Sequence, residues 1–317
     1  VGPLPDRILL RCFQYLALPE LMKLRLVCRR WRQLLYVAPG LFDRLDLTPW
    51  NNSIDDKSLT QITDFVGSRP KFIDISNCYH VTDEGFSYMI NEIGISGQIK
   101  GIKIRGCWEV SAMAIMDIAV PSIGNFLEEI DLTNCRKVRD DVVQRLIGWD
   151  YAFQHHALQQ QRKHSKAKNG GVCALDEPIP GMEMFDPELV SKVSAIGCRN
   201  LKKLVLRYCK GITDLTLYHL SLYANDKLSE LDLTRCTGLT DNGFSYWGLQ
   251  RFERLESLIL SECIFLTDIS IRSIANCAPN LRILNLSFCC SLTDASIELL
   301  CLGCPQLENL NLSFCGR

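Results

Sequence analysis

Pairs of apolar residues separated by one position recur along most of the chain, and a cysteine follows each pair three residues later. Eight copies are present, and they end at Cys78, Cys107, Cys135, Cys209, Cys236, Cys263, Cys289 and Cys315. These cysteines lie 29, 28, 74, 27, 27, 26 and 26 residues apart. An earlier pair, Leu45 and Leu47, has Trp50 in the place of the cysteine. Alternation over so few positions predicts a short strand with one buried side, so we expect nine strands.

A helix is predicted after most of these strands. Thr-Asp stands shortly after the cysteine in five copies, at residues 82–83, 213–214, 240–241, 267–268 and 293–294. Threonine is a good N-cap, and aspartate suits the positive end of the helix dipole. Apolar residues follow at a helical spacing, as in Phe86 and Met89, Val143 and Leu146, Leu217 and Leu220, Phe244 and Trp247, Ile271 and Ile274, and Ile297 and Leu300. Each helix is therefore expected to pack one apolar stripe against the strand layer.

One strand and one helix per repeat cannot bury their apolar sides alone and must stack on neighbouring copies. The sequence therefore predicts an α/β solenoid, a horseshoe with parallel strands on its concave face. The units resemble leucine-rich repeats of the cysteine-containing subclass. Residues 45–317 are expected to form this leucine-rich-repeat domain, with about nine repeats.

The cysteines allow two interpretations, metal or redox chemistry on one side and a ladder of buried thiols on the other. The ladder is favoured because neighbouring cysteines come from different coils. No Cys-x-x-Cys pair is matched by a second one at the spacing of a zinc site, and Cys301 with Cys304 forms a lone pair of this kind. We expect no metal and no cofactor.

The interval of 74 residues exceeds a repeat of 27 by about 47 residues. The segment at about 149–186 is rich in polar residues, glycine and proline and lacks the strand pattern. It is predicted to be a mobile loop, partly helical near residues 153–163. A solvated loop is favoured over a metal cluster of His155, His156 and His164, because ligand partners at a suitable spacing are missing; a regulatory or partner-contact role stays open.

Residues 1–44 follow a different pattern, from which three short helices are predicted. Ile8, Leu9, Cys12, Phe13 and Leu16 share one helical face. Pro19 and Glu20 open a second helix, expected to run to about residue 35. The segment carries more apolar residues than such helices bury among themselves. It is either a cap on the solenoid or a docking module for a partner.

The motifs Leu-Pro-Asp-Arg-Ile-Leu at 4–9, Phe-Gln-Tyr-Leu at 13–16, Leu-Val-Cys-Arg-Arg-Trp at 26–31 and Leu-Phe-Asp-Arg-Leu at 41–45 resemble an F-box. Phe42 and Asp6 stand where that family prefers Trp and Glu. The resemblance implies binding to the adaptor Skp1 and, through it, to a cullin and RING ubiquitin ligase. The implied Skp1 contacts or their supports are Leu4, Pro5, Ile8, Leu9, Leu16, Leu21, Val27, Cys28, Trp31 and Leu41.

An F-box directly before cysteine-containing repeats resembles the F-box/leucine-rich-repeat proteins over almost the whole chain. This implies a non-catalytic substrate-recognition subunit of an SCF (Skp1–cullin–F-box) ligase, which binds a client protein for ubiquitination and proteasomal degradation. Outward strand positions are expected to read the client, acidic or phosphorylated, because they form rows on a rigid face. The candidates are Lys103, Arg105, Lys203, Arg207, Tyr208, Arg235, Phe288 and Phe314. Asp74, Asp131 and Asp232 interrupt the basic rows, and these charges are alternatively only solvated.

Composition narrows the classes further. The chain has 317 residues, with 35 Lys and Arg against 36 Asp and Glu, so a nucleic-acid partner is disfavoured. Its 16 cysteines are few for a disulfide scaffold, which favours reduced thiols in the cytoplasm, the nucleus or both. Neither an apolar span of membrane length nor a leader is visible, so no membrane partner is expected. The missing initiator Met and the end just after a repeat signature suggest a piece of a longer chain.

The sequence also allows three alternatives to a ligase substrate receptor. An enzyme is disfavoured, since no catalytic triad or phosphate-binding loop is visible and His80 and His219 lie in different repeats, where a structural role is favoured. A small-molecule sensor would need a deep cationic pocket, for which the number of basic residues is modest. A non-ligase scaffold stays open, and binding to Skp1 discriminates it from the receptor.

Overall fold

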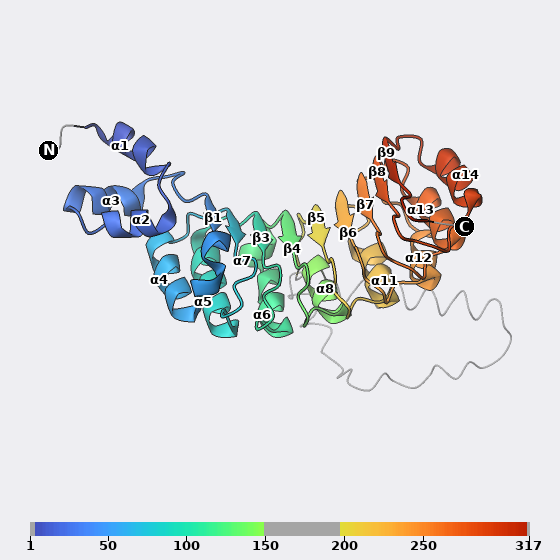
Figure 1. The fold of residues 1–317 in the computed structure, drawn as a ribbon, viewed down its shortest axis with the longest axis horizontal. Coiled ribbons are helices and arrows are strands. Elements are labelled where there is room, and N and C mark those ends of the chain that lie inside the picture. Colours follow the sequence, from blue (N-terminus) through green and yellow to red (C-terminus); the bar gives the residue numbers. More distant parts are fainter. Residues whose placement is uncertain (1–3, 149–196, 316–317) are drawn as a thin grey trace, which may run out of the picture.

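The computed structural model describes residues 4–148 and 197–315. Within them the chain forms one nine-stranded parallel sheet in sequential order, which curves gently with the strands on its inner side and the helices on its outer side (Figure 1). The α/β leucine-rich-repeat prediction is confirmed. The predicted loop at about 149–186, with its three histidines, lies outside the described residues. The strands are β1 (Arg44–Asp46), β2 (Phe72–Asp74), β3 (Gly101–Lys103), β4 (Glu129–Asp131), β5 (Lys203–Val205), β6 (Glu230–Asp232), β7 (Ser257–Ile259), β8 (Ile283–Asn285) and β9 (Asn309–Asn311).

Each strand is three residues long, with its central apolar residue in register with the next one, as Leu231 is with Leu258. The outer layer consists of α4 (Asp56–Val66), α5 (Asp83–Ser96), α6 (Ala112–Met116), α7 (Pro121–Gly124), α8 (Asp140–Ile147), α11 (Asp214–Tyr223), α12 (Asp241–Trp247), α13 (Asp268–Cys277) and α14 (Asp294–Gly303), with the 3-10 turns η1 (Thr48–Ser53) and η2 (Asp117–Ala119). Five of the six predicted apolar pairs are fully buried between the layers. In the sixth, Leu300 is buried but Ile297 is 42% exposed, because no described coil follows α14 to cover it.

An aspartate ladder joins the helix starts of successive coils. The carboxylate of Asp241, the first residue of α12, accepts hydrogen bonds from the backbone N and Oγ1 of Thr267 in the next coil, at 3.0 and 2.7 Å. Asp56, Asp140, Asp214 and Asp268 bond the next threonine in the same way. The sequence assigned Asp214, Asp241 and Asp268 only to their own helix dipoles. The structure shows that they also fasten each helix to its successor.

A cysteine ladder runs beside the strands. The Sγ of Cys236 donates to the carbonyl of Leu206 in the preceding coil at 3.1 Å, and that of Cys263 donates to Leu233 at 3.3 Å. The cysteines of the other coils from Cys107 onward repeat this bond. Burial raises the pKa of these thiols, for example that of Cys209 to about 12, so that they keep the proton they donate. The cysteines therefore stabilise the stacking of coils.

The stacking continues across the 74-residue interval. β4 and β5 pair in parallel register, and the amide of Cys198 bonds the carbonyl of Leu146 at 2.7 Å. The ammonium of Lys227, from the following coil, donates to the carbonyls of Ile147 and of Cys198, the latter at 3.2 Å. Burial lowers the pKa of Lys227. One half-buried cation thus joins the two ends of the chain that flank residues 149–196.

The N-terminal segment forms α1 (Asp6–Phe13), α2 (Leu18–Leu24) and α3 (Arg29–Val37). The prediction of one helix over residues 19–35 is wrong, since α2 ends at Leu24 and α3 begins only at Arg29. Between them Cys28 adopts an extended backbone (φ −157°, ψ 163°), and its Sγ accepts a bond from the amide of Trp31 at 3.4 Å. Cys28 is therefore the N-cap of a separate helix. No helix follows Gly40 before β1.

Candidate functional site

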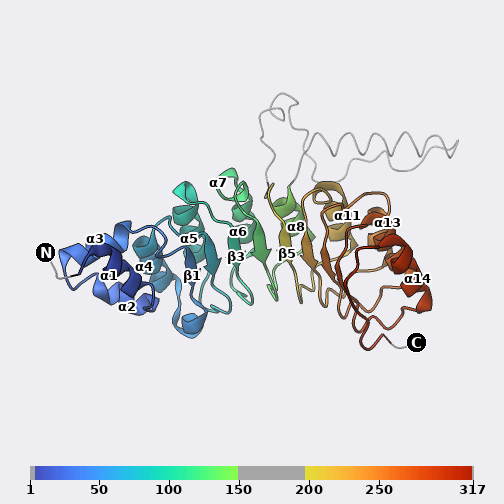
Figure 2. The ribbon, with the colours of Figure 1, turned by 90° about the horizontal axis from the view of Figure 1, so that it is seen from above.

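The N-terminal segment lies at one end of the solenoid next to α4 (Figure 2), which it contacts through α3 and the residues just after it. The ring of Phe42 meets that of Phe65 in α4 edge-on, with centroids 5.2 Å apart. The guanidinium of Arg69 lies over the ring of Phe42 at 4.5 Å and donates to the carbonyl of Leu35 at 2.6 Å. The segment therefore does cap the solenoid, as one of the two interpretations requires.

The same segment leaves an apolar surface uncovered on its other side. Of the ten residues implied by the F-box resemblance, Leu9 and Leu21 are buried, and Trp31 and Leu41 are half-buried. Exposed are Leu4, Pro5, Ile8, Leu16, Val27 and Cys28. The buried members support the helices, whereas the exposed ones are available to a partner.

Side chains within the segment hold this surface in shape. Arg30 of α3 donates through Nε to Asp6 of α1 at 2.8 Å, and through Nη2 to the carbonyl of Leu4 at 2.6 Å. The indole of Trp31 packs edge-on against Phe13, with centroids 5.4 Å apart. The candidate set omitted Tyr15, Leu26 and Val37, which are 84%, 70% and 72% exposed. Tyr15 and Leu26 lie between helices, where apolar spacing does not predict exposure, and Val37 is the last residue of α3.

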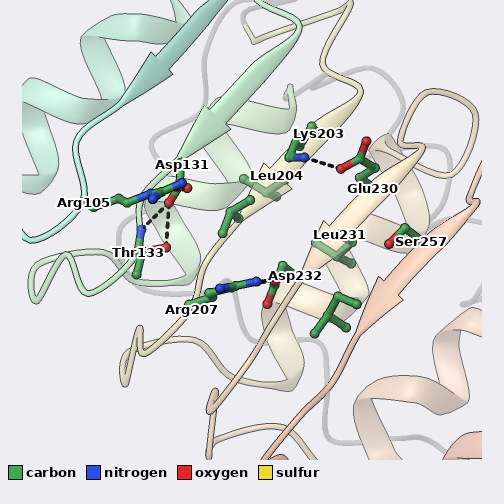
Figure 3. Close-up of a pocket in the computed structure, with 12 residues that line it drawn as sticks. Arg105, Asp131, Thr133, Lys203, Leu204, Arg207, Glu230, Leu231, Asp232 and Ser257 are labelled. Atoms are coloured by element: carbon green, nitrogen blue, oxygen red, sulfur yellow. Dashed lines mark hydrogen bonds and ion pairs between the residues drawn. The ribbon is translucent and has the colours of Figure 1, made fainter. Parts of the chain in front are cut away.

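On the concave face, basic side chains of one strand meet carboxylates of the next (Figure 3). The Nε of Arg105 donates to Oδ2 of Asp131 at 2.7 Å, and Arg207 pairs in the same way with Asp232 at 2.6 Å. Lys203 is paired with Glu230. These pairs surround a hollow of about 330 Å³ across β4 to β7.

Both aspartates of this hollow are almost fully buried. The Oδ1 of Asp131 accepts bonds from the N and Oγ1 of Thr133, at 3.0 and 2.6 Å, and Asp232 does the same with Thr234. Each aspartate is the last residue of its strand, and its carboxylate neutralises an arginine of the preceding coil. The basic residues form a charge-balanced surface rather than a free cationic patch.

A second hollow, of about 180 Å³, lies over β1 to β4. Lys103 lines it together with Arg44, Asp46, Asp74 and Glu129. Here too both signs of charge meet. The structure thus brings Arg105, Lys203 and Arg207 together at one hollow and places Lys103 at another.

The other four candidates lie one position further from the strands than Arg105 and Arg207, which themselves follow β3 and β5 by two residues. Tyr208, Arg235, Phe288 and Phe314 stand in the turn just before the cysteine, with φ between 59° and 63°. This left-handed backbone directs their side chains to the rim of the concave face, which counting outward strand positions did not foresee. In earlier coils the same turn holds Asn77, Gly106 and Asn134, residue types that adopt this conformation more readily.

The rim side chains contact one another. The guanidinium of Arg235 lies 5.5 Å from the ring centre of Tyr208 and 3.4 Å from a carboxylate oxygen of Glu262. The rings of Phe288 and Phe314 are stacked, with centroids 4.6 Å apart and an interplanar angle of 13°. The rim therefore carries a charged part at β5 to β7 and an aromatic pair at β8 and β9.

His219 is buried in α11, where desolvation lowers its pKa and favours the neutral ring. Within residues 4–148 and 197–315, no three His, Cys, Asp or Glu residues gather closely enough to hold a metal ion. None of the helices in these two ranges is both long and apolar enough to cross a membrane.

Comparison with known proteins bears on both parts of the chain. Residues 2–48 match the family described as F-box-like, and residues 277–301 match the family described as Leucine Rich repeat. The chain combines an F-box-like segment with leucine-rich repeats. This combination fits the general role of a ubiquitin-ligase substrate receptor, a class of proteins that is in general non-catalytic.

The chain was also compared with curated sequences and with solved structures. Curated protein sequences contain no match to the chain. Among solved structures, a chain of the crystal structure of the Rad7 and Elc1 complex in yeast is similar, with a TM-score of 0.43 and 18% identity over 98% of this chain and 82% of that one.

Proposed function

We propose that this protein is the substrate-recognition subunit of an SCF ubiquitin ligase. Residues 1–44 would bind a Skp1-type adaptor and, through it, the cullin and RING subunits. Residues 45–317 would hold a client protein on the concave face for ubiquitination and degradation. The covalent chemistry belongs to the other subunits.

One observation carries the adaptor half of this proposal. A segment that served only as a cap would turn its apolar residues toward the solenoid, yet Leu4, Ile8 and Val27 are 44%, 43% and 61% exposed. An apolar surface of this kind, shaped by the Arg30 bonds, is typical of a protein interface. The F-box-like match covers these residues and supports a Skp1-type adaptor as the partner.

For the client we propose contacts with the candidate residues of the concave face and its rim. The ion pairs of Arg105, Lys203 and Arg207 argue against a phosphorylated client, because a phosphate would have to displace carboxylates that already satisfy these cations. A client region of mixed charge fits the balanced hollow better.

Replacing Leu4, Ile8 and Val27 by serine in the full chain is expected to weaken Skp1 binding at least about thirtyfold. Interface residues of this kind contribute about 2 kcal/mol or more as a group. The affinity is measured by isothermal titration calorimetry with purified Skp1, and circular dichroism checks the fold.

The matched control replaces Met113 and Leu249, which are 70% and 81% exposed outside the F-box-like segment, by serine. This variant should bind Skp1 as the parent chain does. If the folded parent chain binds no Skp1, residues 1–44 are only a cap, and the protein is a scaffold of leucine-rich repeats.

A further inference from the structure

The concave face changes character between β6 and β7. On β3 to β6 it carries the ion pairs described above. On β7 to β9 and the residues just after them, the positions on this face carry no charge. They are Ser257, Ile259, Ser261, Ile283, Asn285, Ser287, Asn309, Asn311 and Ser313.

Charged residues of this part lie at its borders and are paired with one another. Arg282, just before β8, lies 3.7 Å from Glu256 and 2.8 Å from Glu308, which precede the two flanking strands. On the opposite border Glu262 is paired with Arg235. The uncharged positions between these borders form a strip, and the paired charges at the borders largely cancel. We call it the neutral strip.

Phe288 and Phe314 form the rim of the neutral strip. Their left-handed backbones, with φ of 63° and 60°, are disfavoured for phenylalanine. Stacking of the two rings offsets part of this cost. The ring of Phe288, which has described coils on both sides, is still 43% exposed, so burial in the fold does not offset the rest. An asparagine or glycine, as in earlier coils, would serve the turn at lower cost, and the exposed ring is available to a partner.

The strip also presents hydrogen-bond donors. The Oδ1 atoms of Asn285 and Asn311 accept bonds from the amides of Ser287 and Ser313, at 2.9 and 3.0 Å. Their Nδ2 groups have no hydrogen-bond partner among the described residues. Because β8 and β9 are neighbouring strands about 4.8 Å apart, these two amide groups lie side by side on the strip.

We propose that the neutral strip binds an uncharged, extended segment of the client protein, with an aromatic or aliphatic side chain packed on Phe288 and Phe314 and main-chain carbonyls bonded to Asn285 and Asn311. This inference rests on the proposed receptor function and names the chemistry of its client. The width from β7 to β9, about 10 Å, accommodates three to four residues of extended chain. A charged residue would lose water here without gaining a counter-ion, so the strip selects against it.

A phage-displayed library of random 12-residue peptides, panned on the full chain, tests this inference. Selected peptides are synthesised with a fluorophore, and their affinities are measured by fluorescence anisotropy. They are expected to share an uncharged core of three to four residues with one aromatic or aliphatic position. Binding should weaken at least tenfold for the Phe288→Ser, Phe314→Ser double variant, and likewise for Ile283→Lys, which puts a charge into the strip.

The Met113→Ser, Leu249→Ser variant is the matched control and should bind the peptides as the parent does. Acidic consensus sequences, equal binding by the double variant, or a panning without enrichment would each overturn the inference. Skp1 affinity is measured on the same variants and should not change. If the chain binds no Skp1 but its peptides depend on the phenylalanine pair, the neutral strip stands and the receptor function fails.

Discussion

Raising the pH from about 8 to about 11 under reducing conditions is expected to unfold the chain cooperatively. Burial raises the pKa of the ladder thiols, to about 12 for Cys107, Cys209 and Cys289, whereas an unfolded thiol titrates near 8.5. A thiol whose pKa is higher in the folded state stabilises the fold fully below about pH 8.5. This stabilisation is lost as the pH rises. The loss is about 1.4 kcal/mol per pH unit for each such thiol. Because several thiols act together, the summed loss exceeds a typical free energy of unfolding of about 5–15 kcal/mol within about two pH units.

The free energy of unfolding is measured by urea denaturation at a series of pH values. Cys209→Ala should make its decline with pH shallower by about 1.4 kcal/mol per unit, because one raised pKa is removed. Cys290→Ala, at an exposed cysteine, should leave the slope unchanged. Equal slopes for all three chains would show that the ladder thiols do not govern alkaline unfolding.

Asp241→Ala is expected to lower the free energy of unfolding by about 3 kcal/mol. The change leaves the backbone N and Oγ1 of Thr267 without their acceptor, together with the hydroxyl of Ser270. Desolvation raises the pKa of Asp241, but the bonds from Ser270 and Thr267 outweigh it, so that the pKa is lowered overall. A pKa that is lower in the folded state means that this stabilisation is present above about pH 4 and is lost at lower pH.

Asp294→Ala is the matched control. Asp294 occupies the same position at the start of α14, but no described coil follows to supply a threonine. Its replacement should change the urea midpoint little. A loss as large as that of Asp241→Ala would mean that these aspartates act on their own helix dipoles rather than between coils.

The repeat pattern predicted the architecture because the alternation of the strands and the apolar spacing of the helices both involve residues close together in the sequence. Alternation gave the strands, and the spacing of Phe244 and Trp247 gave the buried side of a helix. The aspartate ladder could have been predicted in part, since Asp and Thr recur at fixed positions of the repeat. The aspartate–threonine hydrogen bond joins residues about one repeat apart, however, so the sequence of a single helix does not reveal it.

The break between α2 and α3 and the ion pairs of the concave face were harder to predict. Apolar spacing continues through Cys28 as though one helix ran past it, and only the extended backbone there shows the cap. Arg207 looks like a free cation in the sequence, because its partner Asp232 lies 25 residues away on the next strand. The left-handed turn at Phe288 has no sequence signal, since phenylalanine is not a residue that marks such turns.

Lys227 bonds the carbonyls of Ile147 and Cys198, on the two sides of residues 149–196, and these bonds affect how the chain tolerates change. They close that coil at its base, so the register of β4 with β5 is held by residues outside 149–196. The cost of enlarging a loop that is already closed grows only slowly with its length. The number of residues between 148 and 197 can therefore change while the spacing of the nine strands is preserved. The solenoid has an insertion point at which new sequence can accumulate without altering its concave face.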